Sequence, residues 1–247
     1  MSIQNPLTFL ELCQRLQVEC GTSGSLMTTV AGTTGEALRL VTWISSAALE
    51  IQEQHKDYNF LRATKSFVTN TAKEKYTIAD AGIAAGAFGE WVRDSFRSYL
   101  TASGIGGEIF MPYIPYEQWR NQYFIGSIRS LRSQPIVMSV DPQRSLVLGP
   151  IANTGYTVVG DYYISQQALV SDADTLSSVI VTAGGVAIQS GLDHVFSMGI
   201  LGHALMSYGS FENAAELYNK GEKWYNQLIR RLAEDQLDEV VVCGALA

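Results

Sequence analysis

Two stretches near the amino end place apolar residues three and four positions apart. In residues 5–20 the apolar positions are Phe9, Leu12, Cys13 and Leu16, between an Asn5-Pro6 start signal and Gly21. In residues 34–56 they are Leu40, Val41, Ile44, Ala47, Ala48 and Ile51, after a Thr33–Glu36 pair spaced as a capping box. This period fits one face of an α-helix, so both stretches are predicted to be amphipathic helices.

From Arg62 the period shortens to that of strands and turns. Residues 63–70, 74–80, 90–100, 109–114 and 156–166 are rich in Thr, Tyr, Phe and Val and are separated by Gly, Pro and Asp. Residues 135–150 predict a hairpin whose turn begins at Asp141-Pro142. Residues 115–124 predict a short helix that interrupts the strands.

The last third returns to helical periodicity. Residues 186–208 are nearly uncharged and contain glycines, which predicts either a buried helix or a helix broken in the middle. Ser210 is predicted to open an amphipathic helix to about residue 235. The order of elements favours an α+β fold, with an α-helical bundle built from the N- and C-terminal helices plus a central antiparallel β domain. The expected domains are 1–61 with 176–247, including a C-terminal arm, and 62–175.

Composition narrows the function. The 247 residues contain 24 acids and 17 bases, a net charge of −7, which argues against non-specific wrapping of a nucleic acid duplex. Only 17% of the residues are charged, which suggests that part of the surface is covered by other copies or other proteins. The charge is uneven, because residues 145–219 carry six acids and no Lys or Arg. We expect this segment to form acidic surface.

Membrane and disulfide interpretations find little support. Residues 175–192 are uncharged, but hydroxyl residues, Gln189 and glycines interrupt them and no Lys or Arg flanks them, so a membrane span is not expected. Cys13, Cys20 and Cys243 form no CxxC pair, and the amino end has no signal-peptide pattern. The expected place of synthesis is a reducing cytoplasm.

Residues 172–176 (DADTL) resemble the DxDxT pattern of haloacid-dehalogenase-like phosphatases, with the threonine, Thr175, one position earlier. In that family the motif ends an early parallel strand and a lysine follows, whereas here the next lysine is Lys220. The alternative is that Asp172 and Asp174 are solvated residues of a turn. His55, His194 and His203 are not spaced to share a metal, and no GxSxG, P-loop or GxGxxG pattern is present. We therefore expect no catalytic, cofactor-binding or metal-binding residues, and no enzyme.

Two features suggest contacts with partners. Arg129 and Arg132 lie three apart in GSIRSLRSQP, where they either are solvated or meet carboxylates of a neighbouring chain or DNA phosphates. Val240, Val241 and Val242 follow the last predicted helix. An apolar run there favours docking, either on the chain's own sheet or on another subunit.

Segments along most of the chain resemble the head–tail adaptor (neck) proteins of tailed phages. The segments are 9–24, 34–55, 76–83, 93–100, 134–150, 156–163 and 204–237, and they are also similar to tail tubular protein A of short-tailed phages. The resemblance implies a structural virion protein at the neck that forms a ring of twelve copies under the portal protein. It further implies that the helical part and terminal arm grip the portal and that the β part faces a downstream tail or nozzle protein. Genomic DNA would pass through the lumen without specific binding. A tail-completion protein is the alternative.

Overall fold

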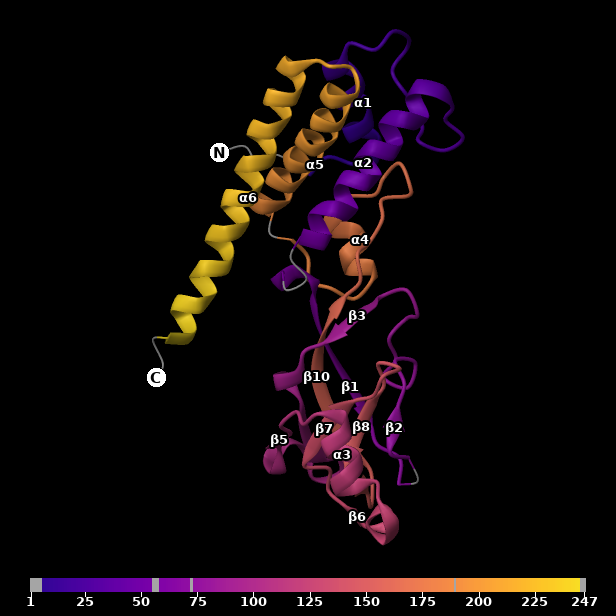
Figure 1. Cartoon of the computed structure of the whole chain (residues 1–247), viewed down its shortest axis with the longest axis vertical. Coiled ribbons are helices and arrows are strands. Elements are labelled where there is room, and N and C mark those ends of the chain that lie inside the picture. The colour runs from indigo at the N-terminus through magenta and orange to yellow at the C-terminus, as the bar shows by residue number, and fades with distance from the viewer. Residues whose placement is uncertain (1–5, 55–57, 72, 189, 245–247) are drawn as a thin grey trace. The chain divides into compact units, whose positions relative to one another are not determined.

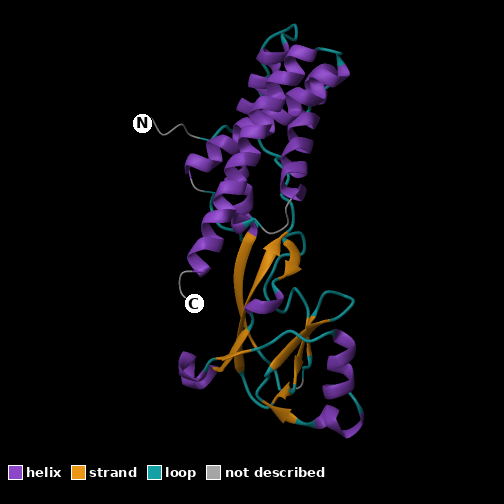
Figure 2. Cartoon of the chain, turned by 60° about the vertical axis from the view of Figure 1, so that its left-hand side comes forward, coloured by secondary structure: helices purple, strands orange, loops and turns teal. Residues whose placement is uncertain are grey.

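The computed structural model describes residues 6–54, 58–71, 73–188 and 190–244. The chain divides into two compact units, Met1–Leu61 with Gln166–Ala247, and Arg62–Ser165. The first unit is helical and the second is built from antiparallel sheets, which confirms the α+β class (Figure 2). The chain re-enters the helical unit at Gln166, earlier than the residue 176 that the sequence suggested.

The helical unit contains five helices (Figure 1). They are α1 (Phe9–Cys20), α2 (Gly35–Gln54), α4 (Leu176–Thr182), α5 (Ser190–Phe211) and α6 (Ala215–Gly244). The apolar face predicted for α1 is buried in full, and that of α2 is buried except for the half-buried Val41. Phe196, Leu205, Leu228 and Leu232 of α5 and α6 complete the core. Burial of these faces drives the assembly of the unit.

Helix ends follow local capping chemistry. Thr8 and Glu11 form the capping box of α1, and Gly21 ends the helix with a left-handed φ of 63°. The expected start at Asn5 lies outside the described residues. The capping box expected at Thr33 is not seen, because the Thr33 hydroxyl donates to the Val30 carbonyl instead.

The glycine-containing segment forms one continuous helix, α5, so the broken-helix alternative is wrong. Its glycines lie against α6. A Cβ on Gly202 would be 2.6 Å from the Gly221 carbonyl oxygen, and one on Gly199 would overlap Leu228. Ser210 belongs to the end of α5 rather than opening the next helix. Asn213, with a φ of 55°, lies in the turn before α6, which runs on to Gly244.

The β unit contains β1 (Arg62–Val68), β2 (Lys75–Tyr76), β3 (Phe88–Trp91), β4 (Arg97–Leu100), β5 (Ile109–Phe110), α3 (Tyr116–Tyr123), β6 (Arg132–Ser133), β7 (Val137–Val140), β8 (Leu146–Gly149), β9 (Ile151–Ala152) and β10 (Tyr156–Ile164). In its main sheet the order is β1-β10-β4-β5, and β3 also pairs with β10. A second sheet has the order β2-β8-β7, and β6 pairs in parallel with β9.

The predicted hairpin is the β7–β8 pair, and the predicted short helix is α3. Asp141 holds the hairpin turn, because its Oδ1 accepts hydrogen bonds from the amides of Gln143 and Ser145. Its other oxygen pairs with Lys75 of β2. The turn residue Asp141 therefore also ties the hairpin to its neighbouring strand.

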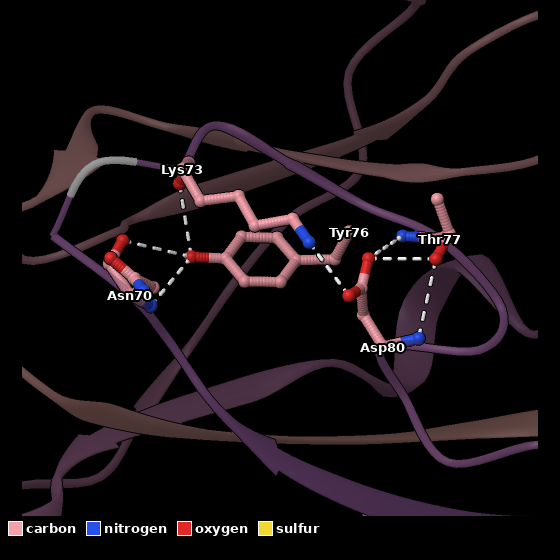
Figure 3. A network of polar contacts seen from close by, with 5 residues as sticks. All are labelled: Asn70, Lys73, Tyr76, Thr77 and Asp80. Carbon is pink, nitrogen blue, oxygen red and sulfur yellow. Dashed lines mark hydrogen bonds and ion pairs between the residues drawn. The ribbon is translucent and has the colours of Figure 1, made fainter.

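A second polar cluster closes the loop around β2 (Figure 3). The buried Tyr76 hydroxyl accepts from the Asn70 amide at 2.9 Å and also bonds to the Lys73 carbonyl at 3.0 Å. Lys73 pairs with Asp80 at 2.6 Å, and Asp80 accepts from the amide and hydroxyl of Thr77. These contacts, with the Lys73 hydrogen bond first, lower the pKa of Asp80 to about 2. The cluster fixes a loop that has little regular structure of its own.

Candidate assembly surfaces

The DxDxT segment lies in the loop between β10 and α4. The Asp172 carboxylate accepts from the Val30 amide at 2.7 Å, and the Asp174 carboxylate accepts from the amides of Val170 and Ser171. Thr175 caps α4. The carbonyls of Asp172 and Asp174 accept from the first amides of α1, those of Leu10 and Phe9. The Asp172 carboxylate thus holds its loop to the loop after α1, whereas the Asp174 carboxylate closes its own turn. Both residues are half-buried members of this turn, in agreement with the turn alternative.

The remaining candidates for chemistry are separate from one another. His203 lies 3.2 Å from Glu50 and packs against Tyr225, whereas His194 lies nine positions earlier on α5, toward the opposite side of that helix. Burial is the main cause that raises the pKa values of Cys13 and Cys20 to about 12, so both thiols stay protonated. No group of three or more His, Cys, Asp or Glu side chains suited to a metal is found in the part of the chain that the structure describes.

Arg129 and Arg132 differ in their surroundings, although both are exposed. Arg129 lies in the 3₁₀ turn 126–130, with its guanidinium 3.9 Å from the centre of the Phe124 ring and donating to the Phe124 carbonyl at 3.1 Å. Arg132 lies on β6 and makes no ion pair or side-chain hydrogen bond with any described residue. Arg132 is therefore the one of the two whose charge is free to meet a partner.

Large apolar residues flank these two arginines in the sequence. Ile125, Ile128, Leu131 and Ile136 are 52%, 41%, 61% and 47% exposed. We call residues 125–136 the β-unit loop surface. It contains no acid and two arginines, so it combines exposed apolar area with positive charge. Apolar area gathered in one segment of a protein surface marks an interaction site more often than scattered apolar residues do.

The carboxyl end differs from the sequence expectation. Val240, Val241 and Val242 do not follow the last helix, because the backbone of α6 continues through them to Gly244. Intrahelical hydrogen bonds therefore occupy the backbone groups that would have been needed to add a strand to the chain's own sheet. The side chains beyond Glu234 lie outside the described part of the structure.

The helical unit also has a groove that the sequence did not suggest. Leu7, Arg15, His194, Met198 and Trp224 are among the residues that line a hollow of about 520 Å³. Leu7 precedes α1, and the other residues belong to α1, α5 and α6. The groove is therefore built from segments that are far apart in the sequence. The Trp224 ring lies 5.9 Å from the Arg15 guanidinium and 5.1 Å from the Lys220 ammonium.

The six acidic residues of 145–219 differ in their exposure to solvent. Asp161 pairs with Arg62 at 2.6 Å and accepts from Thr64. Asp172 and Asp174 hold the loop described above, and Asp193 is only 5% exposed. Of these four residues only Asp193 is buried and the other three are half-buried, whereas Glu212 and Glu216 are exposed.

Comparison with protein families decides the broader identity. The model of the SU10 adaptor protein family matches residues 7–242. The chain belongs to this family of phage head–tail adaptors. The match supports the resemblance to neck proteins, but it does not extend to the tail tubular protein A comparison. No match is found among the curated proteins.

Membership in the SU10 adaptor family changes how the surfaces are interpreted. It identifies a phage structural adaptor, implies a location at the head–tail junction of the virion, and implies contacts with other head and tail components. It also points to a protein without enzymatic activity. No helix in the described ranges is long and apolar enough to cross a bilayer. The β-unit loop surface and the groove of the helical unit are accordingly candidate contact sites within the neck.

Proposed function

We propose that this adaptor forms a closed ring between the portal protein and the tail and that the ring continues the channel for genomic DNA. Membership of the SU10 adaptor family along residues 7–242 carries the proposal. Twelve copies is the number that the resemblance to neck proteins implies. A ring needs one heterologous contact, repeated until the rotation closes, so each copy must offer two different surfaces. The groove of the helical unit is a candidate for one of them.

The proposed orientation puts the helical unit against the portal and the β unit toward the next tail or nozzle component. Exposed Ile128, Leu131 and Arg132 support a protein contact at the β unit, because arginine and large apolar residues are enriched in protein interfaces. Burial of the Ile128 and Leu131 side chains is favourable because it removes apolar area from water.

The net charge of −7 supports passage of DNA rather than its retention. A channel of like charge offers little counterion release, so the phosphate backbone gains no strong binding energy on entering it. The support comes from the overall charge of the chain.

Electron cryomicroscopy of the particle neck tests the proposal directly. We expect density for a closed ring of this chain between the portal and the tail, with the β unit on the tail side. Density elsewhere in the tail would favour the tail-completion alternative. Native mass spectrometry of the isolated protein and of a mixture with the portal protein tests whether the portal acts as a template. We expect rings only in the mixture, and stable rings of the isolated chain would contradict the template.

The β-unit contact is tested by charge reversal. Arg132→Glu is expected to weaken co-purification with the tail component by tenfold or more, an energy of about 1.4 kcal/mol. Arg120→Glu is the matched control, because Arg120 is also an exposed arginine of the β unit, in α3, but its partner is Glu117 of the same helix. Equal effects of the two substitutions would contradict a specific contact at the β-unit loop surface.

A further inference from the structure

The groove of the helical unit combines an apolar floor with an uncompensated positive charge. Leu7, Val195, Met198 and Trp224 line it, and Arg15 lies at Trp224. Arg15 makes no ion pair with any residue in the described ranges. The groove is wide enough, at about 520 Å³, to receive several side chains. It is therefore suited to a segment that presents apolar and acidic residues together.

Positive charge continues from this groove along α6. Gln227 lines both the groove and an adjoining hollow of about 500 Å³, which Lys223, Arg230 and Arg231 also line. Only Arg231 has a carboxylate partner, Glu234, at 3.0 Å. Within the described part of the chain, Lys223 and Arg230 have none. The groove and this hollow together form what we call the α6 basic groove.

The end of α6 has the complementary sequence. Residues 235–247 contain Asp235, Asp238 and Glu239 and then three consecutive valines, and they contain no Lys or Arg. The helix runs past the beginning of α5, its neighbour in the unit (Figure 1). Acidic and apolar residues at this end match the basic and apolar character of the α6 basic groove.

The end of α6 cannot occupy the groove of its own chain. Gln227 and Cys243 lie on the same continuous helix, about 24 Å apart along its axis at 1.5 Å per residue. To fold back, the helix would have to lose its backbone hydrogen bonds over several turns. A second copy of the chain can supply the same segment without that loss.

We propose that the end of α6 from one copy docks in the α6 basic groove of the next. The two surfaces differ, so the contact is heterologous and can repeat from copy to copy. This inference rests on the proposed ring, and it assigns to the neighbouring copy an arm that the resemblance to neck proteins places on the portal. Val240–Val242 supply the apolar part of the contact and Asp238 and Glu239 the charged part.

A disulfide trap tests the contact in the full chain. Cys243 is native to the arm, and Met198→Cys places a thiol in the groove, with Cys20→Ser added to remove a background thiol. Mild oxidation of the protein mixed with the portal protein, the condition in which rings are expected, should give a ladder of covalent dimers, trimers and larger species of this chain. The ladder should disappear with Cys243→Ser. It should also be absent when the new thiol is at Leu38→Cys, an exposed position of α2 away from the groove.

Each other outcome of the trap overturns the inference. A product that stops at the dimer indicates a symmetric contact, and a disulfide within one chain shows that α6 does fold back. An equal ladder from Leu38→Cys indicates random collision. A ring seen in the neck without any ladder would keep the proposed function and remove this contact from it.

Charge reversal in two separate variants gives an independent test. One variant carries Lys223→Glu and Arg230→Glu in the groove, and the other carries Asp238→Lys and Glu239→Lys in the arm. In the trap background, each variant alone is expected to lose at least nine-tenths of the ladder. An equimolar mixture should recover it, because the reversed arm of one variant then meets the reversed groove of the other, and the two unchanged surfaces meet at the next contact. Failure to recover overturns the inference. So does tight binding of a short DNA duplex that the groove variant abolishes, since the groove would then be a nucleic acid site.

Discussion

Gly202 of α5 and Gly221 of α6 lie backbone against backbone, so that a Cβ on Gly202 would be 2.6 Å from the Gly221 carbonyl oxygen and 2.9 Å from the Tyr225 amide nitrogen. A Cβ on Gly221 would approach the Gly202 carbonyl oxygen more closely still. Backbone atoms of two helices cannot move aside as a flexible side chain can. The absence of a side chain at both positions therefore sets the distance between α5 and α6.

Gly202→Ala is accordingly expected to destabilise the protein, although alanine is the better helix former by about 1 kcal/mol. Overpacking of a close contact costs about 1–3 kcal/mol and here involves main-chain atoms. Thermal unfolding should show a lower Tm for Gly202→Ala and for Gly221→Ala. Gly106→Ala is the control, because nothing lies within 4 Å of its Cβ position and its φ is negative. An unchanged Tm in Gly202→Ala would mean that α5 and α6 do not pack backbone against backbone.

The charged carboxylate of Asp193, near the start of α5, is expected to lower the free energy of unfolding at neutral pH. Burial raises the pKa of its carboxyl from 3.8 to about 6, and its Oδ1 accepts no hydrogen bond from the described residues. Because the folded-state pKa lies above the unfolded one, the folded protein loses stability as the pH rises from about 4 to about 6. Above that range the loss is complete.

Asp193→Asn removes the buried charge and keeps the shape. It is expected to raise the free energy of unfolding at pH 8 by up to about 3 kcal/mol, from about two pKa units at 1.36 kcal/mol each. The gain should vanish at pH 4, where the wild-type carboxyl is also neutral when folded. Denaturant unfolding at both pH values measures it. Asp94→Asn at an exposed position is the control and should change little at either pH; a gain at pH 8 that persists at pH 4 would contradict burial of the Asp193 charge as its cause.

Local sequence patterns predicted most helices and strands but not which of them pack against one another. The spacing of Phe9, Leu12 and Leu16 identified the buried face of α1, because a helix repeats every 3.6 residues whatever it packs against. The glycines of α5 left two alternatives open, since only contact with α6 shows why they are glycines. The length of α6 was underestimated, because no glycine or proline lies between the predicted end at about residue 235 and Gly244, and an apolar run alone does not end a helix.

The surfaces required long-range information. Asp172 matched a catalytic pattern, but its role depends on the Val30 amide, 142 positions away in the chain. The groove of the helical unit depends on residues from three helices, and no spacing in the sequence relates Leu7 to Val195 or Trp224. Sequence placed Arg129 and Arg132 in one exposed segment. It could not show that the Phe124 ring and carbonyl hold Arg129, while Arg132 has no described partner.

Asp80 is expected to stabilise the loop around β2 in a pH-dependent way. Its pKa is lowered to about 2, first by the hydrogen bond from Lys73 and then by those from Thr77. The lowered folded-state pKa means that the stabilisation is present above the unfolded value of 3.8 and is lost as the pH falls toward 2. Asp80→Asn should lower stability by about 1 kcal/mol at pH 7, a value reduced for partial exposure, and by little at pH 2. Glu117→Gln is the control, because Glu117 forms an exposed ion pair with Arg120, and it should leave the free energy of unfolding nearly unchanged. If Glu117→Gln lowers stability as much as Asp80→Asn does, the network around Tyr76 contributes no more than a surface ion pair.

The effect of substituting Asp172 separates a structural role from a catalytic one. Asp172→Ala removes the acceptor of the Val30 amide and should destabilise the protein by about 1–2 kcal/mol, because that amide lies in a partly buried loop. Asp172→Asn keeps an acceptor oxygen and should cost less. Both variants and the wild type are expected to hydrolyse an aryl phosphate no faster than buffer does. Suppose instead that the wild type hydrolyses the substrate faster than buffer and that Asp172→Asn abolishes this rate without changing the Tm. Asp172 would then be a nucleophile, because losing a hydrogen-bond acceptor of one amide would lower stability as well as turnover.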